Sequence, residues 1–235
     1  MMVLLPEARG DVCHLCHDGG MARLIDLSHT IADGTVTYPG LPAPRISDHL
    51  SREASRQHYS AGTTFQIARL EMVANTGTYL DAPAHRYEGK PDVAGLPLDG
   101  VANLEGIVLE ISGRSLPAEA VEGSLRGRAV LIRTGWSRHF GTPAYGNGQH
   151  PFVTRAAAEA LAAAGAAVVG IDSLNIDDTT DGTRPAHSVL LAAGIPIVEH
   201  LTALDQLPMN GFRFFAVPPK FVGMGTFPVR AFAIV

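Results

Sequence analysis

The most informative stretch for the fold is NTGTYLDAPAH, residues 75–85, which gathers a glycine, a proline, a carboxylate and an imidazole directly after a predicted strand. Side chains alternate along an extended backbone, so Asn75, Tyr79 and Asp81 are expected to point to one face. Asp81 and His85 can then converge on one ligand or ion, with Pro83 stiffening the turn between them. The alternative is that Asp81 caps a turn and His85 lies on the surface, and the residues alone leave both interpretations open.

A second cluster lies nearer the C-terminus. His187 follows Arg184 in the sequence RPAH, and Glu199 comes twelve residues later at the end of the apolar run IPIVE. A carboxylate at the end of a buried strand must be paired, protonated or bound to a metal, because burying it alone is costly. Glu199 therefore either pairs with an arginine such as Arg184 or Arg230, or acts with His187 as a ligand. Asp172 likewise ends an apolar run, and ligand sites of α/β proteins gather at the ends of parallel strands.

Apolar runs typical of strands outnumber the helical segments. The expected strands cover residues 23–26, 65–74, 106–111, 129–133, 167–171, 195–199, 212–217 and 229–235. One clear helix covers 154–165, with Thr154 as the N-cap and Gly165 just after its end, and a shorter helix covers 187–193. The first of these helices and the strands on either side of it form a right-handed crossover unit. We therefore predict an α/β fold with a mixed central sheet, few helices and one domain over residues 21–235.

Composition and charge narrow the class of protein. Hydrophobic residues make up 46% of the 235 residues and charged residues only 17%, which excludes disorder for most of the chain. The net charge of −5 argues against a nucleic-acid partner, because phosphate neutralisation needs a surplus of Lys and Arg. The uncharged run 160–171 is shorter than the roughly 20 residues of a membrane span. We expect a small-molecule substrate, no nucleic acid and no membrane as partners.

The first twenty residues differ from the rest of the chain. They hold both cysteines, Cys13 and Cys16, and show no periodicity, so we interpret residues 1–20 as a poorly ordered N-terminal extension. The segment from Cys13 to His17 fits the c-type haem pattern C-x-x-C-H, and adventitious zinc binding is a further alternative. A haem protein would need secretion and an axial-ligand pocket, and neither is evident. Cysteine usage instead fits a reducing compartment, and we predict a cytoplasmic protein.

The two clusters together resemble the cyclase family, which includes bacterial kynurenine formamidases and isatin hydrolases. The family signature is H-x-G-T-H-x-D-x-P-x-H, and residues 75–85 match its Gly, Thr, Asp, Pro and final His in register. The resemblance continues through the segments 26–28, 38–40, 170–172, 185–187, 195–201 and 204–208, so it covers about residues 21–235. It implies a swivelling β/β/α fold and a hydrolase of an amide, formamide or lactone of a small cyclic or aromatic compound. The best-known activity in the family is hydrolysis of N-formylkynurenine in tryptophan catabolism.

The resemblance also implies a set of site residues. Asp81, His187 and Glu199 would be ligands of one divalent ion, zinc or manganese, which lowers the pKa of a bound water. His85, the last signature histidine, would be the proton donor and acceptor in catalysis together with Asp81, a role that suits an imidazole at neutral pH. Tyr38 matches the position of an aromatic residue that stacks on the substrate in formamidases of the family. Its alternative is an ordinary Tyr-Pro turn.

Two signature histidines are missing, because Asn75 and Tyr79 occupy their positions. An amide oxygen and a protonated phenol are poor ligands for zinc, so we expect at most one bound ion, and a site without an ion is the alternative. Asn75 and Tyr79 would then contact substrate, and Tyr79 would hydrogen-bond Asp81 or a substrate carbonyl. Two alternatives stay open: a metal-free enzyme that uses His85 with Asp81, and a non-catalytic small-molecule binder.

A homo-oligomer, most simply a C₂ dimer, is also predicted. The segment 31–60 is long and contains prolines, serines and aromatic residues, and the chain is poor in charge. Relatives are commonly dimers or larger assemblies, and C₂ is the commonest symmetry of soluble oligomers.

Overall fold

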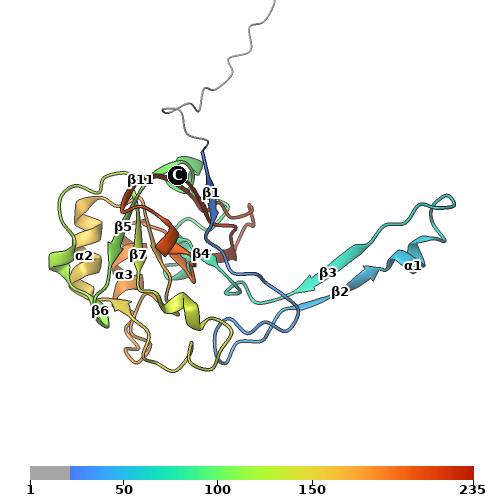
Figure 1. Ribbon diagram of the computed structural model, residues 1–235, viewed down its shortest axis with the longest axis horizontal. Coiled ribbons are helices and arrows are strands. Elements are labelled where there is room, and N and C mark those ends of the chain that lie inside the picture. Colours follow the sequence, from blue (N-terminus) through green and yellow to red (C-terminus); the bar gives the residue numbers. More distant parts are fainter. Residues whose placement is uncertain (1–21) are drawn as a thin grey trace, which may run out of the picture.

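The computed structural model describes residues 22–235 and is built around one mixed nine-stranded sheet (Figure 1). Its strand order is β1-β13-β11-β5-β7-β9-β10-β4-β12. These strands are β1 (Leu24–Asp26), β13 (Phe232–Ile234), β11 (Asn210–Phe215), β5 (Leu104–Glu110), β7 (Ala129–Arg133), β9 (Val168–Ile171), β10 (Ile197–Glu199), β4 (Tyr79–Asp81) and β12 (Thr226–Pro228). Neighbours from β5 to β10 run parallel, and the other pairs are antiparallel. Four short strands lie outside this sheet: β2 (Arg45–Leu50), β3 (Ile67–Glu71), β6 (Ser115–Leu116) and β8 (Phe152–Val153).

The helices are few, as predicted. They are α1 (Arg52–Ser55), α2 (Arg155–Ala164) and α3 (Pro185–Ala192), together with the 3₁₀ turns η1 (Pro83–His85), η2 (Leu98–Gly100), η3 (Ala118–Ala120), η4 (Trp136–His139) and η5 (Leu204–Gln206). Helix α2 confirms the prediction for 154–165, since the Thr154 hydroxyl accepts from the Ala157 N–H and Gly165 ends the helix at a φ of 84°. Helix α3 begins two residues earlier than predicted, because Pro185 fits the first helical turn.

Both faces of the central sheet are buried. Along β7, Val130 and Ile132 pack with the apolar faces of α2 and α3, and Leu131 points to the opposite core formed with β5 and β11. Alternation of side chains across a strand places neighbours on opposite faces. A strand covered on both faces reads as a continuous apolar run, which is why the runs 129–133 and 167–171 were recognisable in the sequence. The α/β fold with a mixed central sheet and few helices is confirmed.

One predicted strand lies elsewhere than in the central sheet. Residues 65–74 contain the shorter strand β3, which pairs with β2 in an arm that projects away from the body (Figure 1). All residues of β3 are exposed, with Ile67 at 48% and Leu70 at 53%. An isolated two-stranded hairpin is marginally stable in water. The arm therefore presents apolar side chains that the rest of this chain does not cover.

The structure does not test the predictions for the N-terminal extension and for the domain boundaries. The extension 1–20, with its segment Cys13–His17, lies outside the described residues. The boundaries of the domain predicted for 21–235 stay a prediction. Within residues 22–235, no helix has the length and hydropathy needed to cross a bilayer.

Candidate active site

The site lies where β4 and β10 pair next to helix α3. In this antiparallel pair Tyr79 faces Glu199, and Asp81 faces Ile197. Strand β12 pairs on the other side of β4 and places Thr226 beside Asp81. Directly opposed residues share a face of the sheet, so the alternation predicted from the sequence places these polar side chains together. The intervening residue of β4 points into the opposite apolar core.

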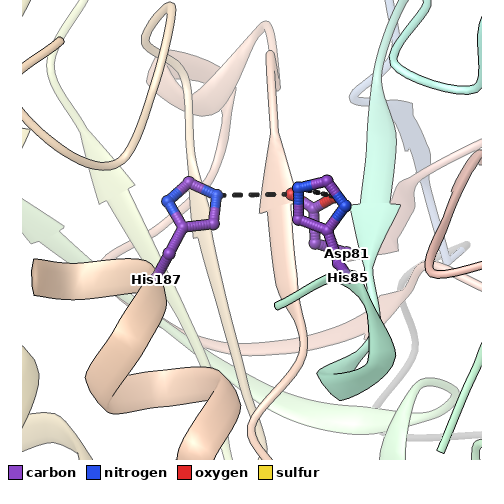
Figure 2. Close-up of side chains that lie close together, drawn as sticks. All are labelled: Asp81, His85 and His187. Carbon is purple, nitrogen blue, oxygen red and sulfur yellow. Dashed lines mark ion pairs between the residues drawn. The ribbon is translucent and has the colours of Figure 1, made fainter. Parts of the chain in front are cut away.

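Asp81, His187 and Glu199 converge below the surface. The Nε2 atom of His187, which reaches over the sheet from α3, lies 3.6 Å from Oδ2 of Asp81 (Figure 2). The same atom lies 3.7 Å from Oε1 of Glu199. Asp177 fixes the ring, because its Oδ2 lies 2.7 Å from Nδ1 of His187. Asp81 and Glu199 are buried, and Oδ2 of Asp81 has no hydrogen-bond partner. His187 thus lies between two buried carboxylates, one at the end of β4 and one at the end of β10.

The charges in this cluster shift the pKa values of its members. Burial opposes protonation of His187, but Glu199, Asp177 and Asp81 raise its pKa to about 10. Burial raises the pKa of Glu199 to about 7, with His187 acting against it. Burial also raises the pKa of Asp81, yet His187 and His85 outweigh it and the pKa of Asp81 lies below its usual value. A positive charge between the two carboxylates is therefore strongly favoured.

A second arrangement connects His85 to the same aspartate. The Thr226 hydroxyl donates to Oδ1 of Asp81, and its oxygen lies 2.7 Å from Nδ1 of His85. Because the hydroxyl has one proton and gives it to the carboxylate, Nδ1 of His85 must be the donor to the hydroxyl oxygen. With Nδ1 as the donor, Nε2 is the ring nitrogen that carries the lone pair, and it lies 3.7 Å from Oδ1 of Asp81. The side chain of His85 is 36% exposed, so solvent and substrate can reach it.

Tyr79 does not bond to Asp81, the first of the two partners predicted for it, and the predicted contact with a substrate carbonyl stays a prediction. Its hydroxyl donates to Oε2 of Glu199 at 2.7 Å and lies 3.2 Å from Nε2 of His200, whose Nδ1 is 2.7 Å from the Tyr145 hydroxyl. Burial lowers the pKa of His200 to about 3, so the ring is neutral. Burial, Glu199 and Asp81 raise the pKa of Tyr79 well above its usual value, and the phenol stays protonated. The reason for the difference is register, since Tyr79 directly opposes Glu199 across the strand pair.

A cavity of about 380 Å³ opens above these residues. Its wall contains the predicted residues Tyr38, Asn75, Tyr79, His85, His187 and Glu199, together with Pro39, Gly40, Leu41, Arg86, Asn175 and Arg184. Asp81 lies beneath this wall, in contact with His85 and His187. The structure thus brings all the predicted site residues to one place, from both halves of the chain.

Comparison with known proteins decides the family. The Cyclase family model matches residues 25–178, which is more than half of the chain. The chain belongs to the cyclase family. The kynurenine formamidase of Maricaulis maris (strain MCS10) is 26% identical over 226 residues, covering 90% of this chain and 97% of that protein.

Solved structures agree with this cyclase fold. Isatin hydrolase A from Labrenzia aggregata, bound to benzyl benzoate, superposes with a TM-score of 0.76 at 22% identity, covering 91% of this chain and 94% of its own. A potential metal-dependent hydrolase with cyclase activity superposes with a TM-score of 0.73 at 26% identity, covering 91% and 98%. This cyclase is a hydrolase of the same family, with the mixed sheet and few helices of that fold.

The residues of this cyclase fit one metal ion. Oδ2 of Asp81 is buried without a hydrogen bond, and Nε2 of His187 lies 3.6 Å from it and 3.7 Å from Oε1 of Glu199, which also accepts a hydrogen bond from the Ile176 N–H. A ring nitrogen held by a carboxylate on its other side, as Asp177 holds His187, is typical of metal-binding histidines. Asp81, His85 and His187 also place ligand atoms within 4.8 Å of one another, so His85 is a further candidate ligand.

The residues do not fit a second ion at the position of the missing signature histidines. Tyr79 is fully buried and protonated, and its hydroxyl occupies Oε2 of Glu199. Asn75 offers only a neutral amide at the same wall.

Several residues of the site escaped sequence reasoning. Thr226 and His200 have no spacing that connects them to residues 75–85, because β12 and β10 reach the site only through the folded sheet. Gly225 is another such residue, since a Cβ there would lie 2.6 Å from the backbone of His85.

The proposed ion pairs of Glu199 with Arg184 or Arg230 are wrong: Arg230 pairs with Asp26 instead.

Proposed function

We propose that this cyclase hydrolyses the C–N bond of a small aromatic or cyclic amide, with a formamide as the leading substrate class and a lactone as the oxygen counterpart. The observation that carries the proposal is the chain His85–Thr226–Asp81, which leaves Nε2 of His85 as a base at the cavity wall. The relative named kynurenine formamidase supports an arylformamide. A purely binding protein would have no need of such a chain.

His85 supplies the proton transfers in this proposal. Its Nε2 accepts a proton from the water that attacks the substrate carbonyl, and Thr226 and Asp81 stabilise the imidazolium that forms. The same proton then goes to the leaving nitrogen, so that the C–N bond breaks as an acid and a neutral amine are formed. Asn75 and Tyr79 line the cavity and are the proposed substrate contacts, with the Tyr79 hydroxyl held by Glu199.

Asp81, His187 and Glu199 are the residues that would hold one divalent ion, zinc or manganese. Such an ion polarises a carbonyl and lowers the pKa of a bound water. Tyr38 and Pro39 also line the cavity, where a flat ring can lie against them. The cavity volume of about 380 Å³ suits a single-ring or two-ring compound.

We also propose that the enzyme is cytoplasmic, because its cysteine usage fits a reducing compartment.

The test combines a substrate panel with elemental analysis. Purified protein is assayed on an arylformamide, a cyclic amide and an aryl lactone, before and after removal of metal with a chelator. Turnover that falls on chelation and returns with zinc or manganese supports the proposal. Turnover that survives complete metal removal supports the metal-free alternative, which the hydrogen bond from Tyr79 to Glu199 favours. Binding of a substrate without any turnover would indicate a non-catalytic small-molecule binder and contradict the proposal.

We also propose a homodimer that covers the arm. The apolar side chains of Ile46, Phe65, Ile67 and Leu70 are each 45–53% exposed on this two-stranded arm, and a second copy of the chain offers matching surface by C₂ symmetry. Light scattering at micromolar concentration is expected to give about twice the 24.8 kDa of one chain. Ile67→Lys with Leu70→Lys should shift the protein toward monomer, whereas the matched body variant Leu98→Lys, at a similarly exposed position, should not. A stable wild-type monomer would contradict the proposal.

A further inference from the structure

The cavity contains two arginines that the proposed chemistry does not use. Arg184 is half-buried and Arg86 is exposed, and both line the cavity together with His85. Glu199 lines it too, and His187 lies 3.7 Å from Glu199 and 3.6 Å from the buried Asp81. The acids of the cavity therefore pair with His187, and the two arginines add cationic groups that these acids do not contact.

Arg184 has no carboxylate partner among residues 22–235. Its Nη1 donates to the backbone oxygens of Asp178 at 2.9 Å and Asp181 at 3.2 Å. The side chains of these two aspartates are engaged elsewhere: Asp178 pairs with Arg114 and accepts from Thr180, and Asp181 accepts from Thr183. No carboxylate of residues 22–235 forms a salt bridge with this guanidinium at the cavity, although Arg184 helps to lower the pKa of Asp181 through space.

The backbone also fixes the position of Arg184. The residue has a φ of 47° and a ψ of 63°, a left-handed conformation that is rare for a side chain other than glycine, at the start of α3. The bonds from Nη1 to the two carbonyls hold the side chain against this turn. The remaining N–H groups of the planar guanidinium are thus available to a ligand in a fixed fork, which matches a carboxylate.

Tyr38 lies within the electrostatic reach of this charge. Burial raises the pKa of Tyr38, and Arg184 acts in the opposite direction. The two side chains line the same cavity. The aromatic side chain and the cation together can bind an aromatic ring that carries a negative group.

We propose that Arg184 binds a carboxylate of the substrate, so that the enzyme selects aromatic amides that carry a separate carboxylate over neutral aromatic amides. The selectivity in catalysis rests on the proposed function, because the inference names the substrate class of the same site. The carboxylate would lie on the guanidinium fork of Arg184, with the ring beside Tyr38 and the scissile carbonyl directed toward His85.

The first experiment compares two isosteric substrates, 2-formamidobenzoate and its neutral analogue 2-formamidobenzamide. Wild type is expected to prefer the carboxylate in kcat/KM. Arg184→Gln should lower kcat/KM for the carboxylate by about 10- to 100-fold, mainly through KM, and change the neutral substrate less than about twofold, as expected for loss of hydrogen bonds to a charged group. Arg155→Gln, which removes the same charge from the exposed face of α2, is the matched control and should change neither. Equal losses on both substrates, or the selective loss in Arg86→Gln instead, would overturn the assignment to Arg184.

The second experiment does not depend on turnover. Calorimetric titration with benzoate and benzamide should show wild type binding benzoate, with about tenfold or more weaker binding by Arg184→Gln and unchanged benzamide binding. Arg184→Lys, which keeps the charge, should retain more benzoate affinity than Arg184→Gln at an unchanged melting temperature. Equal loss in the two variants with a lowered melting temperature would mean that only the turn is damaged, and would overturn the inference. If no formamide is hydrolysed while benzoate binding still depends on Arg184, the proposed function fails and the carboxylate site stands.

Discussion

Replacement of His85 by alanine is expected to lower kcat by about 10²–10⁴-fold, the usual contribution of a positioned general base. The reason is the chain from Nδ1 of His85 through the Thr226 hydroxyl to Asp81, which fixes the ring and makes Nε2 the atom that receives the proton. The substrate contacts of the cavity wall remain, so KM should change much less than kcat. Steady-state kinetics on a substrate identified in the panel, at constant metal loading, measure this split.

Thr226 offers a matched pair of variants for the same prediction. Thr226→Ser keeps the hydroxyl and should retain most of the activity, whereas Thr226→Val removes it at similar size and should lower kcat by about tenfold or more, since it breaks the connection between His85 and Asp81. Wild-type turnover in His85→Ala would contradict the base role. Equal activity of the two Thr226 variants would show that the hydroxyl does not orient the imidazole.

The fold was predictable where local pattern and packing agree. The runs 129–133 and 167–171 and the helix between them were recognisable because burial on both faces demands continuous apolar strands, and because Thr154 and Gly165 satisfy the two ends of α2. The strands β4 and β12 were not recognisable, since each has only three residues and carries polar side chains that serve the site. Apolar residues of β3 predicted a strand correctly, but nothing local shows that it belongs to a projecting arm.

The site was predictable in its members more than in its contacts. The spacing of residues within 75–85 predicted that Asp81 and His85 lie close together, and the position of Glu199 at the end of a buried strand predicted its role in the site. The hydrogen-bond partners depend on cross-strand register, which no local pattern gives. Register is the reason that Tyr79 bonds to Glu199 instead of Asp81. Thr226 enters through the same kind of pairing, from a strand 145 positions further along the chain.

The two missing histidines lead to a prediction about metal content. Wild type is expected to hold at most one zinc or manganese ion per chain, with Asp81, His187 and Glu199 as ligands. The protonated phenol of Tyr79 donates to Oε2 of Glu199 and so occupies an oxygen that a second ion would need. Asn75 can add only a neutral amide oxygen, which binds zinc weakly.

Restoring the imidazoles should therefore add an ion. Asn75→His with Tyr79→His is expected to raise bound metal by up to one ion per chain, measured by elemental analysis after equal dialysis of both proteins against zinc or manganese. Tyr79→Phe is the matched control: it frees Oε2 of Glu199 without supplying a nitrogen, and it should show no such gain because an oxygen alone does not replace two imidazole donors. Two ions per chain in wild type would refute the idea directly. An equal metal content in the double variant and wild type would mean that positions 75 and 79 do not face the ion, although both line the cavity beside Glu199.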